Sequence, residues 1–306
     1  PYADTFISES QLKMSEPVLP LEVFLCNRCG AVQLGCISND FERYNLYSYS
    51  YTSANSAFSR NHWDKYAETM IKRFDIKNKA VIEIGSNDGY LINKFKKDNK
   101  VVGVDPSHAV AKIAKSTYGI QTITELFSLQ ASKQVKKGFG KADLILANNV
   151  FNHSNNPLDF AKGVSNLLTE NGVFVFEMPY WLDTIKSGKF DQIYHEHVSY
   201  FTVNFAYKLL AKAGLEIFNT EEVEYHGGSL RIYAKPMKGA LLKKIKKVQD
   251  MINKEEKFGL FKISTYLKFQ KDITLARDKF LSKLFNLKSK GYPIVAVGAA
   301  AKGNTF

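Results

Sequence analysis

A short apolar strand that runs into a glycine loop constrains this chain more than any other feature. Residues 80–84 form an apolar run that predicts a buried strand, and the loop Gly-Ser-Asn-Asp-Gly follows at 85–89. Tyr90, Leu91 and Phe95 then recur at helical spacing. A strand, a glycine loop and a helix in this order open a doubly wound sheet that binds nucleotides. The sequence therefore predicts an α/β fold.

The charges around the loop indicate which cofactor it suits. The loop has the pattern G-x-x-x-G, whereas a dinucleotide fingerprint has G-x-G-x-x-G. Glu83 precedes the loop and Asp88 lies inside it, so a pyrophosphate would meet two carboxylates. A cofactor with an amino-acid cation and no phosphate would suit them better. Asp105 ends the next predicted strand, 101–104, where a carboxylate can accept hydrogen bonds from both ribose hydroxyls.

These segments together resemble motif I and the following acidic position of class I S-adenosylmethionine (SAM)-dependent methyltransferases. The alternative is a dinucleotide-binding Rossmann domain. The resemblance implies that SAM is the cofactor and that the following residues bind it: Glu83, Gly85, Asn87, Gly89 and Asp105.

Further strands continue the pattern of a doubly wound sheet. Apolar runs predict strands at 120–123, 143–147 and 172–177, and two closing antiparallel strands at 215–219 and 229–234. The strand at 143–147 leads into Asn-Asn-Val-Phe-Asn-His, which ends at His153. In doubly wound folds ligands bind at this carboxyl edge.

A second polar cluster follows the predicted strand at 172–177. Tyr194, His195, Glu196 and His197 are consecutive. A neutral imidazole with a carboxylate or phenol nearby is a good general base near neutral pH. Two alternatives are a zinc site on the His-x-His pair, which lacks a third ligand, and histidines that bond only to the backbone.

Composition narrows the class of protein. A chain of 306 residues with 45% hydrophobic content predicts two or more domains with a sizeable core. The sequence contains no signal peptide and no apolar run long enough for a membrane span, so we expect no membrane partner. Three cysteines form no disulfide framework, which favours the cytoplasm. Nine of the twelve net positive charges lie between residues 239 and 290, which favours a solvated helix face over a nucleic-acid site.

A cysteine pair near the amino terminus has the spacing of a metal site. Cys26 and Cys29, followed by Gly30, form half of a zinc ribbon or knuckle. A structural zinc needs four ligands, and Cys36 is the only other cysteine. The alternative is a pair of reduced cysteines without metal.

Four motifs carry a more specific resemblance, to the sugar C-methyltransferases that act on nucleotide-linked keto-deoxy-sugars. They are Glu-Ile-Gly-Ser-Asn-Asp-Gly at 83–89, Gly-Val-Asp-Pro-Ser at 103–107, Tyr-His-Glu-His at 194–197 and His-Gly-Gly-Ser-Leu-Arg at 226–231. The resemblance implies a partial zinc-binding domain at 1–40, a methyltransferase domain at 41–238, and a helical linker with the start of a Rossmann-like domain at 239–306. It also implies a chain cut at both ends, with a second cysteine pair upstream that completes a structural Zn²⁺ site.

The same resemblance implies roles for individual residues. His197 is expected to be the base, assisted by Glu196, while Tyr194, Tyr51 and His153 line the sugar pocket. A base beside a ketone can form an enolate, which makes carbon nucleophilic enough for a methyl donor. We expect a monomer with a nucleotide-sugar substrate and no nucleic-acid partner. The alternatives are an O- or N-methyltransferase on a small molecule or RNA, and a non-enzymatic zinc-ribbon protein that binds no SAM.

Overall fold

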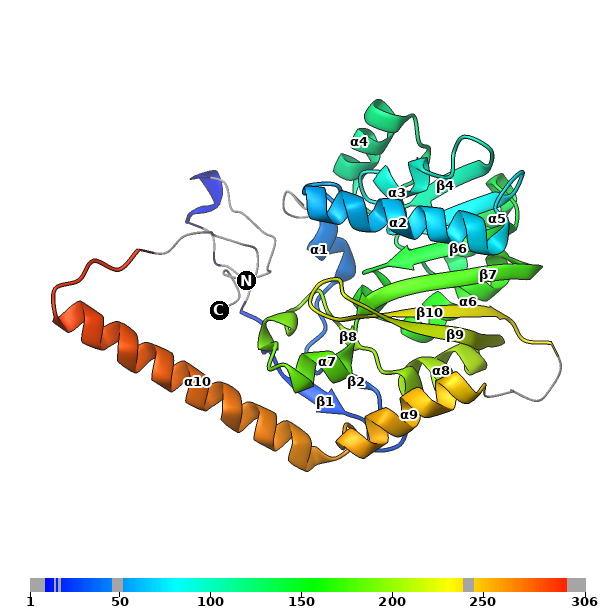
Figure 1. Cartoon of the computed structure of the whole chain (residues 1–306). Coiled ribbons are helices and arrows are strands. Elements are labelled where there is room, and N and C mark those ends of the chain that lie inside the picture. The colour runs from blue at the N-terminus through cyan, green and yellow to red at the C-terminus, as the bar shows by residue number, and fades with distance from the viewer. Residues whose placement is uncertain (1–8, 14, 16–17, 46–51, 239–244, 296–306) are drawn as a thin grey trace.

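The computed structural model describes residues 9–13, 15, 18–45, 52–238 and 245–295. Its centre is a seven-stranded sheet with the order β5-β4-β3-β6-β7-β10-β9 (Figure 1). The five strands from β5 to β7 are parallel, and β10 runs antiparallel to both β7 and β9. A parallel sheet that closes with an antiparallel hairpin is the class I methyltransferase topology, so the predicted fold class is confirmed.

The predicted strands all form, with small shifts of their ends. The sheet consists of β3 (Ala80–Ile84), β4 (Lys100–Val104), β5 (Thr122–Ile123), β6 (Ala142–Asn148), β7 (Leu168–Pro179), β9 (Leu215–Val223) and β10 (Ser229–Pro236). Their register sets the site, because Glu83 pairs with Gly103 on one side and Leu146 on the other. The ends of β3, β4 and β6 therefore meet at one edge.

Helices cover both faces of the sheet, which explains why its strands are apolar throughout. On one face, α2 (Ala57–Phe74), α3 (Tyr90–Asn93) and α4 (His108–Tyr118) pack with Val81, Leu144 and Val175. On the other face, α5 (Leu129–Gly138), α6 (Pro157–Leu167) and α8 (Val203–Lys212) pack with Ile82, Ile145 and Phe174. Consecutive residues of a strand therefore pack into the hydrophobic cores on opposite faces of the sheet.

The amino-terminal segment is joined to the methyltransferase sheet by a second, smaller sheet. Its order is β1-β2-β8, with β1 (Val23–Leu25) and β2 (Val32–Leu34) forming a hairpin and β8 (Ser199–Tyr200) pairing with β2. Helix α1 (Asp40–Asn45) follows the hairpin and lies beside the large sheet (Figure 1). Because β8 begins two residues after His197, the hairpin supports the polar cluster directly.

Two helices follow the large sheet. Helix α9 (Lys246–Phe258) is anchored by the buried Glu255, which accepts hydrogen bonds from the first backbone N–H groups of α8 at Val203 (2.6 Å) and Asn204 (3.1 Å). Helix α10 (Ile263–Ser289) extends away from the body (Figure 1) and buries none of its residues. Most of the segment expected to open a Rossmann-like domain, residues 296–306, lies outside the described residues. In the described part of the chain, no helix combines the length and the apolar content that a bilayer crossing requires.

Candidate functional site

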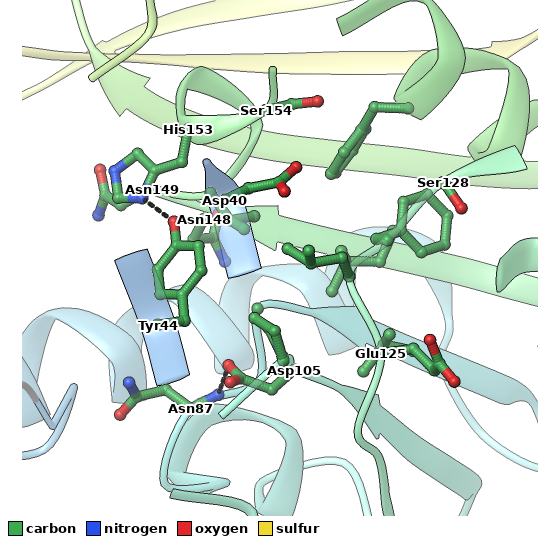
Figure 2. A pocket seen from close by; sticks show the side chains of 18 of the residues that line it. Asp40, Tyr44, Asn87, Asp105, Glu125, Ser128, Asn148, Asn149, His153 and Ser154 are labelled. Atoms are coloured by element: carbon green, nitrogen blue, oxygen red, sulfur yellow. Dashed lines mark hydrogen bonds between the residues drawn. The ribbon is translucent and has the colours of Figure 1, made fainter. Parts of the chain in front are cut away.

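A cavity opens at the edge where β3, β4 and β6 end (Figure 2). Its volume is about 270 Å³. The walls come from the glycine loop after β3, from Asp105 after β4, from the segments after β5 and β6, and from α1. Of the residues predicted from the sequence, Gly85, Asn87, Asp105 and His153 line it.

The glycine loop has the tight backbone expected of a cofactor cradle. Gly85 and Gly89 have positive φ angles of 70° and 79°, which L-residues adopt only with strain. A Cβ atom at Gly85 would lie 2.8 Å from the Val150 side chain, and one at Gly89 would lie 2.9 Å from Ala114. Both positions therefore require glycine, and the backbone at Gly85 stays open to the cavity.

Asp105 supplies a buried carboxylate next to this loop. Its Oδ2 accepts a hydrogen bond from the Asn87 N–H (2.9 Å) and its Oδ1 from the Ser107 N–H (3.0 Å). Burial raises the pKa of Asp105 to about 6, against the opposing effect of these two N–H donors. A carboxylate oxygen can accept more than one hydrogen bond, so Asp105 can still receive ribose hydroxyls.

Glu83 and Gly89 lie behind the cavity wall. Glu83 is almost fully buried, and burial raises its pKa well above the usual range. Neither residue lines the cavity, so any part they have in cofactor binding is to shape the loop. Both residues contribute through the backbone: Glu83 pairs with Gly103 of β4, and Gly89 is the N-cap of α3.

A polar clamp across the loop was not predicted. Asn87 Oδ1 accepts the Ser53 N–H (2.9 Å), and Asp88 accepts the Ser53 hydroxyl (2.7 Å) and the Ala54 N–H (3.0 Å). Asp88, expected to attract a cationic cofactor group, is thus bonded to the turn that precedes α2. Ser53 itself lines the cavity. The clamp closes one side of the cavity with chain that precedes β3.

The opposite wall was also missed. Glu125, Leu126, Phe127 and Ser128 follow β5 and line the cavity (Figure 2). The Glu125 carboxylate can accept a hydrogen bond from an amine, and Leu126 and Phe127 can pack against a flat ring. The adenine end of SAM offers both an amine and a flat ring. The available signal was an acidic residue, Glu125, two positions after the strand predicted at 120–123.

His153 faces the cavity from the short 3₁₀ helix η2 (Phe151–His153) after β6. Its Nδ1 is 3.1 Å from the Tyr44 hydroxyl on α1 (Figure 2). Its Nε2 is buried and has no hydrogen-bond partner among the residues that the structure describes. Burial lowers the pKa of His153 well below the usual range, and the charges of His197 and Arg43 lower it further. His153 is therefore a neutral imidazole.

His197 lies beside His153, with 5.2 Å between the ring centroids. Its Nδ1 is 2.8 Å from the Gln192 carbonyl oxygen, and its Nε2 is 2.9 Å from the Tyr194 hydroxyl. A carbonyl only accepts, so Nδ1 donates, and the neutral ring keeps a lone pair on Nε2. Glu196 is buried close enough to raise the pKa of the Tyr44 phenol, though burial contributes more.

The side chains of the Tyr-His-Glu-His cluster at 194–197 do not all point to the same place. His195 is directed to the amino-terminal segment, where its Nε2 is 3.2 Å from the Leu19 carbonyl oxygen. Tyr194, Glu196 and His197 are buried or half-buried but do not line the cavity. Tyr51 lies outside the described residues. The two Tyr–His pairs, Tyr44–His153 and Tyr194–His197, were not predicted as pairs.

A second buried charge cluster lies at the end of β7. Glu177 is fully buried and accepts hydrogen bonds from Arg231 Nε (2.8 Å) on β10 and from His62 Nε2 (2.8 Å) on α2. Burial alone would raise the pKa of Glu177, but His62 and Arg231 outweigh it and the pKa is lowered. His62 also stacks on Tyr225 at 3.8 Å. The cluster fixes α2 to the sheet.

The cysteine pair does not complete a metal site within the described residues. Cys26 and Cys29 lie in the turn of the β1–β2 hairpin, where the Gly30 N–H donates to the Cys26 carbonyl oxygen (2.9 Å). No group of three or more His, Cys, Asp or Glu in the described ranges could hold a metal ion. Two ligands fall short of the four that a structural zinc requires.

Comparisons with known proteins agree with this geometry. Residues 59–220 match the family described as "Methyltransferase domain", and residues 224–306 match "C-methyltransferase C-terminal domain". The chain is 27% identical to C-methyltransferase NovU from Streptomyces niveus over 309 residues, which cover 100% of this chain and 72% of that protein.

Two solved methyltransferase structures align with more than half of this chain. An S-adenosylmethionine-dependent methyltransferase from Clostridium acetobutylicum aligns with a TM-score of 0.46 at 14% identity, over 60% of this chain and 94% of that one. The magnesium protoporphyrin IX methyltransferase of Synechocystis, with bound SAH, aligns with a TM-score of 0.45 at 15% identity, over 57% and 81%. From its topology, its glycine cradle and its family matches, the chain belongs to the methyltransferase-domain family and is a SAM-dependent methyltransferase whose carboxy-terminal part matches that of C-methyltransferases.

Proposed function

We propose that this C-methyltransferase acts on a nucleotide-linked keto-deoxy-sugar and methylates a carbon next to the ketone through an enolate. The observation that carries the proposal is the meeting of two imidazoles, His153 and His197, each hydrogen-bonded to a tyrosine. Transfer to oxygen or nitrogen needs at most one base. Transfer to carbon needs a base for the C–H proton and a donor for the oxygen of the enolate.

The cofactor fits the loop side of the cavity. Gly85, Asn87 and Asp105 would hold its methionine and ribose portions, and Glu125 would meet its adenine. When bound, SAM supplies a methyl group on a positively charged sulfur. The protein then has to bring a nucleophilic carbon to that methyl, and orientation of the two reactants alone contributes a large share of the rate.

We assign to His197, which lies behind the cavity-lining ring of His153, the uptake of the proton from the substrate carbon. Its Nδ1–H is committed to the Gln192 carbonyl, so only Nε2 can take up a proton. Tyr194 already donates to Nε2, and the pair accepts the proton as a unit. Glu196 is the buried carboxylate of the same turn and orients it. His153 lines the cavity and stabilises the enolate oxygen.

The experiment uses the protein with SAM and a panel of nucleotide keto-sugars. We expect a product heavier by one methyl, with the methyl on carbon by ¹³C NMR. With substrate and demethylated cofactor in D₂O, deuterium should wash into the carbon next to the ketone. A methyl found on oxygen or nitrogen would refute the proposal and favour an O- or N-methyltransferase.

Variants of two neighbouring histidines isolate the base. His197→Asn should lower turnover by about 10²- to 10⁴-fold, which is the usual contribution of a general base. It should also abolish the exchange of deuterium. His195→Asn is the matched control, because His195 faces the Leu19 carbonyl. If His197→Asn exchanges deuterium at the wild-type rate, the base lies elsewhere.

A further inference from the structure

Asn149 is a strained residue that directly follows β6 and lines the cavity (Figure 2). Its φ angle is 52°, in the left-handed region that few residues other than glycine adopt. Its backbone N–H donates to the Glu177 carbonyl oxygen of β7 (2.7 Å), which holds the turn against the sheet. A glycine would adopt this conformation with less strain. The presence of an asparagine here therefore points to a task for its side chain.

The ordinary task of a left-handed asparagine is a local hydrogen bond of its side-chain amide. Asn87 in the glycine loop has a positive φ angle and follows this rule, because its Oδ1 accepts the backbone N–H groups of Ser53 (2.9 Å) and Asp88 (2.8 Å). The Asn149 side chain forms no hydrogen bond with any residue that the structure describes, and its Oδ1 is buried without a partner. Asn149 as a whole is partly exposed and lines the cavity, which leaves its Nδ2 as the amide atom that can meet a ligand.

The place of Asn149 in the sheet indicates which ligand it meets. The order of the parallel strands changes direction between β3 and β6, and doubly wound folds bind ligands at this switch point. On one side, Gly85, Asp105 and Glu125 follow β3, β4 and β5 and are the residues proposed to hold the cofactor. On the other side, Asn149 follows β6, and its neighbour Val150 lies against Gly85. Asn149 is thus at the border between the cofactor and the space left for the substrate.

We infer that the Asn149 side-chain amide donates a hydrogen bond from Nδ2 to the ketone oxygen of the substrate and stabilises the charge on that oxygen in the enolate. The inference rests on the proposed function, which supplies the ketone. A carbonyl oxygen only accepts hydrogen bonds, so it matches an N–H donor. The fixed backbone places this donor before the charge develops, which is the condition for strong stabilisation of an oxyanion. Asn149 acts beside His153, which lines the same cavity.

The hydrogen bond acts where charge accumulates. When the base takes the proton from the carbon next to the ketone, the C–H electron pair forms a C=C bond and the C=O π pair moves onto the ketone oxygen. The Nδ2–H group of Asn149 then faces an anionic oxygen, and a hydrogen bond to an ionised acceptor is stronger. When the carbon attacks the methyl group, the pair returns from the oxygen and the sulfur leaves with the electrons of its methyl bond.

Two substitutions separate the amide from the backbone. Asn149→Gly removes the side chain and adopts the left-handed conformation readily, whereas Asn149→Asp keeps the shape and replaces the donor nitrogen by an oxygen. We expect each variant to lower kcat by about 10²-fold, the effect of losing one oxyanion donor. In Asn149→Gly, the affinity for SAM should change less than about threefold, because the loop and ribose contacts remain.

A matched control makes the same backbone change away from the cavity. Asn78 also has a positive φ angle (55°), but it lies in an exposed turn before β3. Asn78→Gly should keep the kcat of the wild type. Deuterium exchange then identifies the step: with keto-sugar and demethylated cofactor in D₂O, Asn149→Gly should exchange more slowly than Asn78→Gly by the factor seen in kcat, because the donor acts on the enolate.

The outcomes are distinguishable. A wild-type kcat in Asn149→Gly, or a loss confined to the affinity for SAM, would overturn the inference, while carbon methylation by the wild type would still support the proposed function. Equal losses in Asn149→Gly and Asn78→Gly would assign the effect to the backbone and also overturn it. If the wild type methylates no keto-sugar, or methylates oxygen, the proposed function fails and the inference fails with it. If Asn149→Gly does not fold, Asn149→Asp decides by itself.

Discussion

Two of the arginines that the structure describes are buried, and they differ in the charge of their partners. Arg231 on β10 forms an ion pair with Glu177 (2.7 Å) and lies over the ring of Tyr66, 4.5 Å from its centroid. Arg43 on α1 bonds only to carbonyl, hydroxyl and amide oxygens. Both guanidinium groups are nearly inaccessible to water. Only one has a counter-ion in the described structure.

The two arginines belong to different parts of the molecule: Arg231 lies in the scaffold, and Arg43 lies next to the cavity. The Arg231 cluster lies between the strands and α2. Its charges compensate one another, so it holds α2 against the sheet and contributes little net charge to its surroundings. The Arg43 cluster lies behind the cavity, and within the described residues no carboxylate forms an ion pair with it. We therefore expect a loss of stability when the first cluster is cut, and a loss of rate with modest destabilisation when the second is cut.

The largest effect is expected from Glu177→Ala. It removes the buried partner of Arg231 and leaves only the more distant, partly exposed Glu221 at 3.7 Å. Loss of a buried partner costs about 3–5 kcal/mol in the free energy of unfolding. Arg43→Met removes hydrogen bonds to charged donors and should cost about 1.5–3 kcal/mol. Urea denaturation of both variants measures the difference. Replacement of Glu177 and Arg231 together by Met should recover part of the loss, and equal losses in the two single variants would break the comparison.

Asp105 extends the comparison to a buried anion with neutral partners. Its folded pKa of about 6 lies above the 3.8 of an unperturbed aspartate, so the folded state holds a proton that the unfolded chain releases between these two pH values. Ionisation therefore destabilises the ligand-free fold as pH rises. Asp105→Asn should gain stability relative to wild type by up to about 3 kcal/mol between pH 4 and pH 7, measured by denaturation at each pH.

The same variant should bind the cofactor less well. Loss of a charged acceptor for the ribose hydroxyls costs about 1.5–3 kcal/mol, which titration calorimetry with SAM would detect. A stability difference that stays flat with pH would show that Asp105 does not titrate as its burial implies. Unchanged SAM affinity would remove the ribose assignment.

The smallest effect is expected at the clamp. Ser53→Ala removes the hydroxyl that donates to Asp88, a half-buried contact worth about 1 kcal/mol. We expect a weakening of SAM binding of roughly fivefold, since 1.4 kcal/mol corresponds to a factor of ten. Ser116→Ala, at an exposed hydroxyl on α4, is the control. Equal affinities in both variants would show that the clamp does not close the cofactor site.

The sheet and its cofactor loop were predictable because their signals are local. The strand before Gly85 is a continuous apolar run, and two glycines and Asp105 occupy positions where backbone geometry or register leaves few alternatives. Helix α5 was missed because its residues, Leu129–Gly138, are mostly polar, with Ala131, Ser132 and Val135 as its buried residues. The low apolar content of this helix, and not a lack of helical periodicity, made it hard to predict.

The other half of the site was not predictable from local pattern. Arg43 and Tyr44 lie 110 and 109 positions from His153, and Ser53 lies 35 from Asp88. No periodicity in the sequence predicts these contacts. Likewise, His195 and His197 are equivalent by position, and only the fold directs one to Leu19 and the other to Gln192.

The pairing of β8 with β2 has a consequence for how the protein folds. Val32 lies opposite Tyr200 and Gln33 opposite Ser199, so a loop of more than 160 residues closes before these contacts form. Contacts this distant in sequence are slow to form, whereas the neighbouring strands of the parallel sheet join over shorter loops. We expect the turn of residues 194–197, which precedes β8, to be the last part to order, so that a newly made chain can bind its cofactor before this turn is in place.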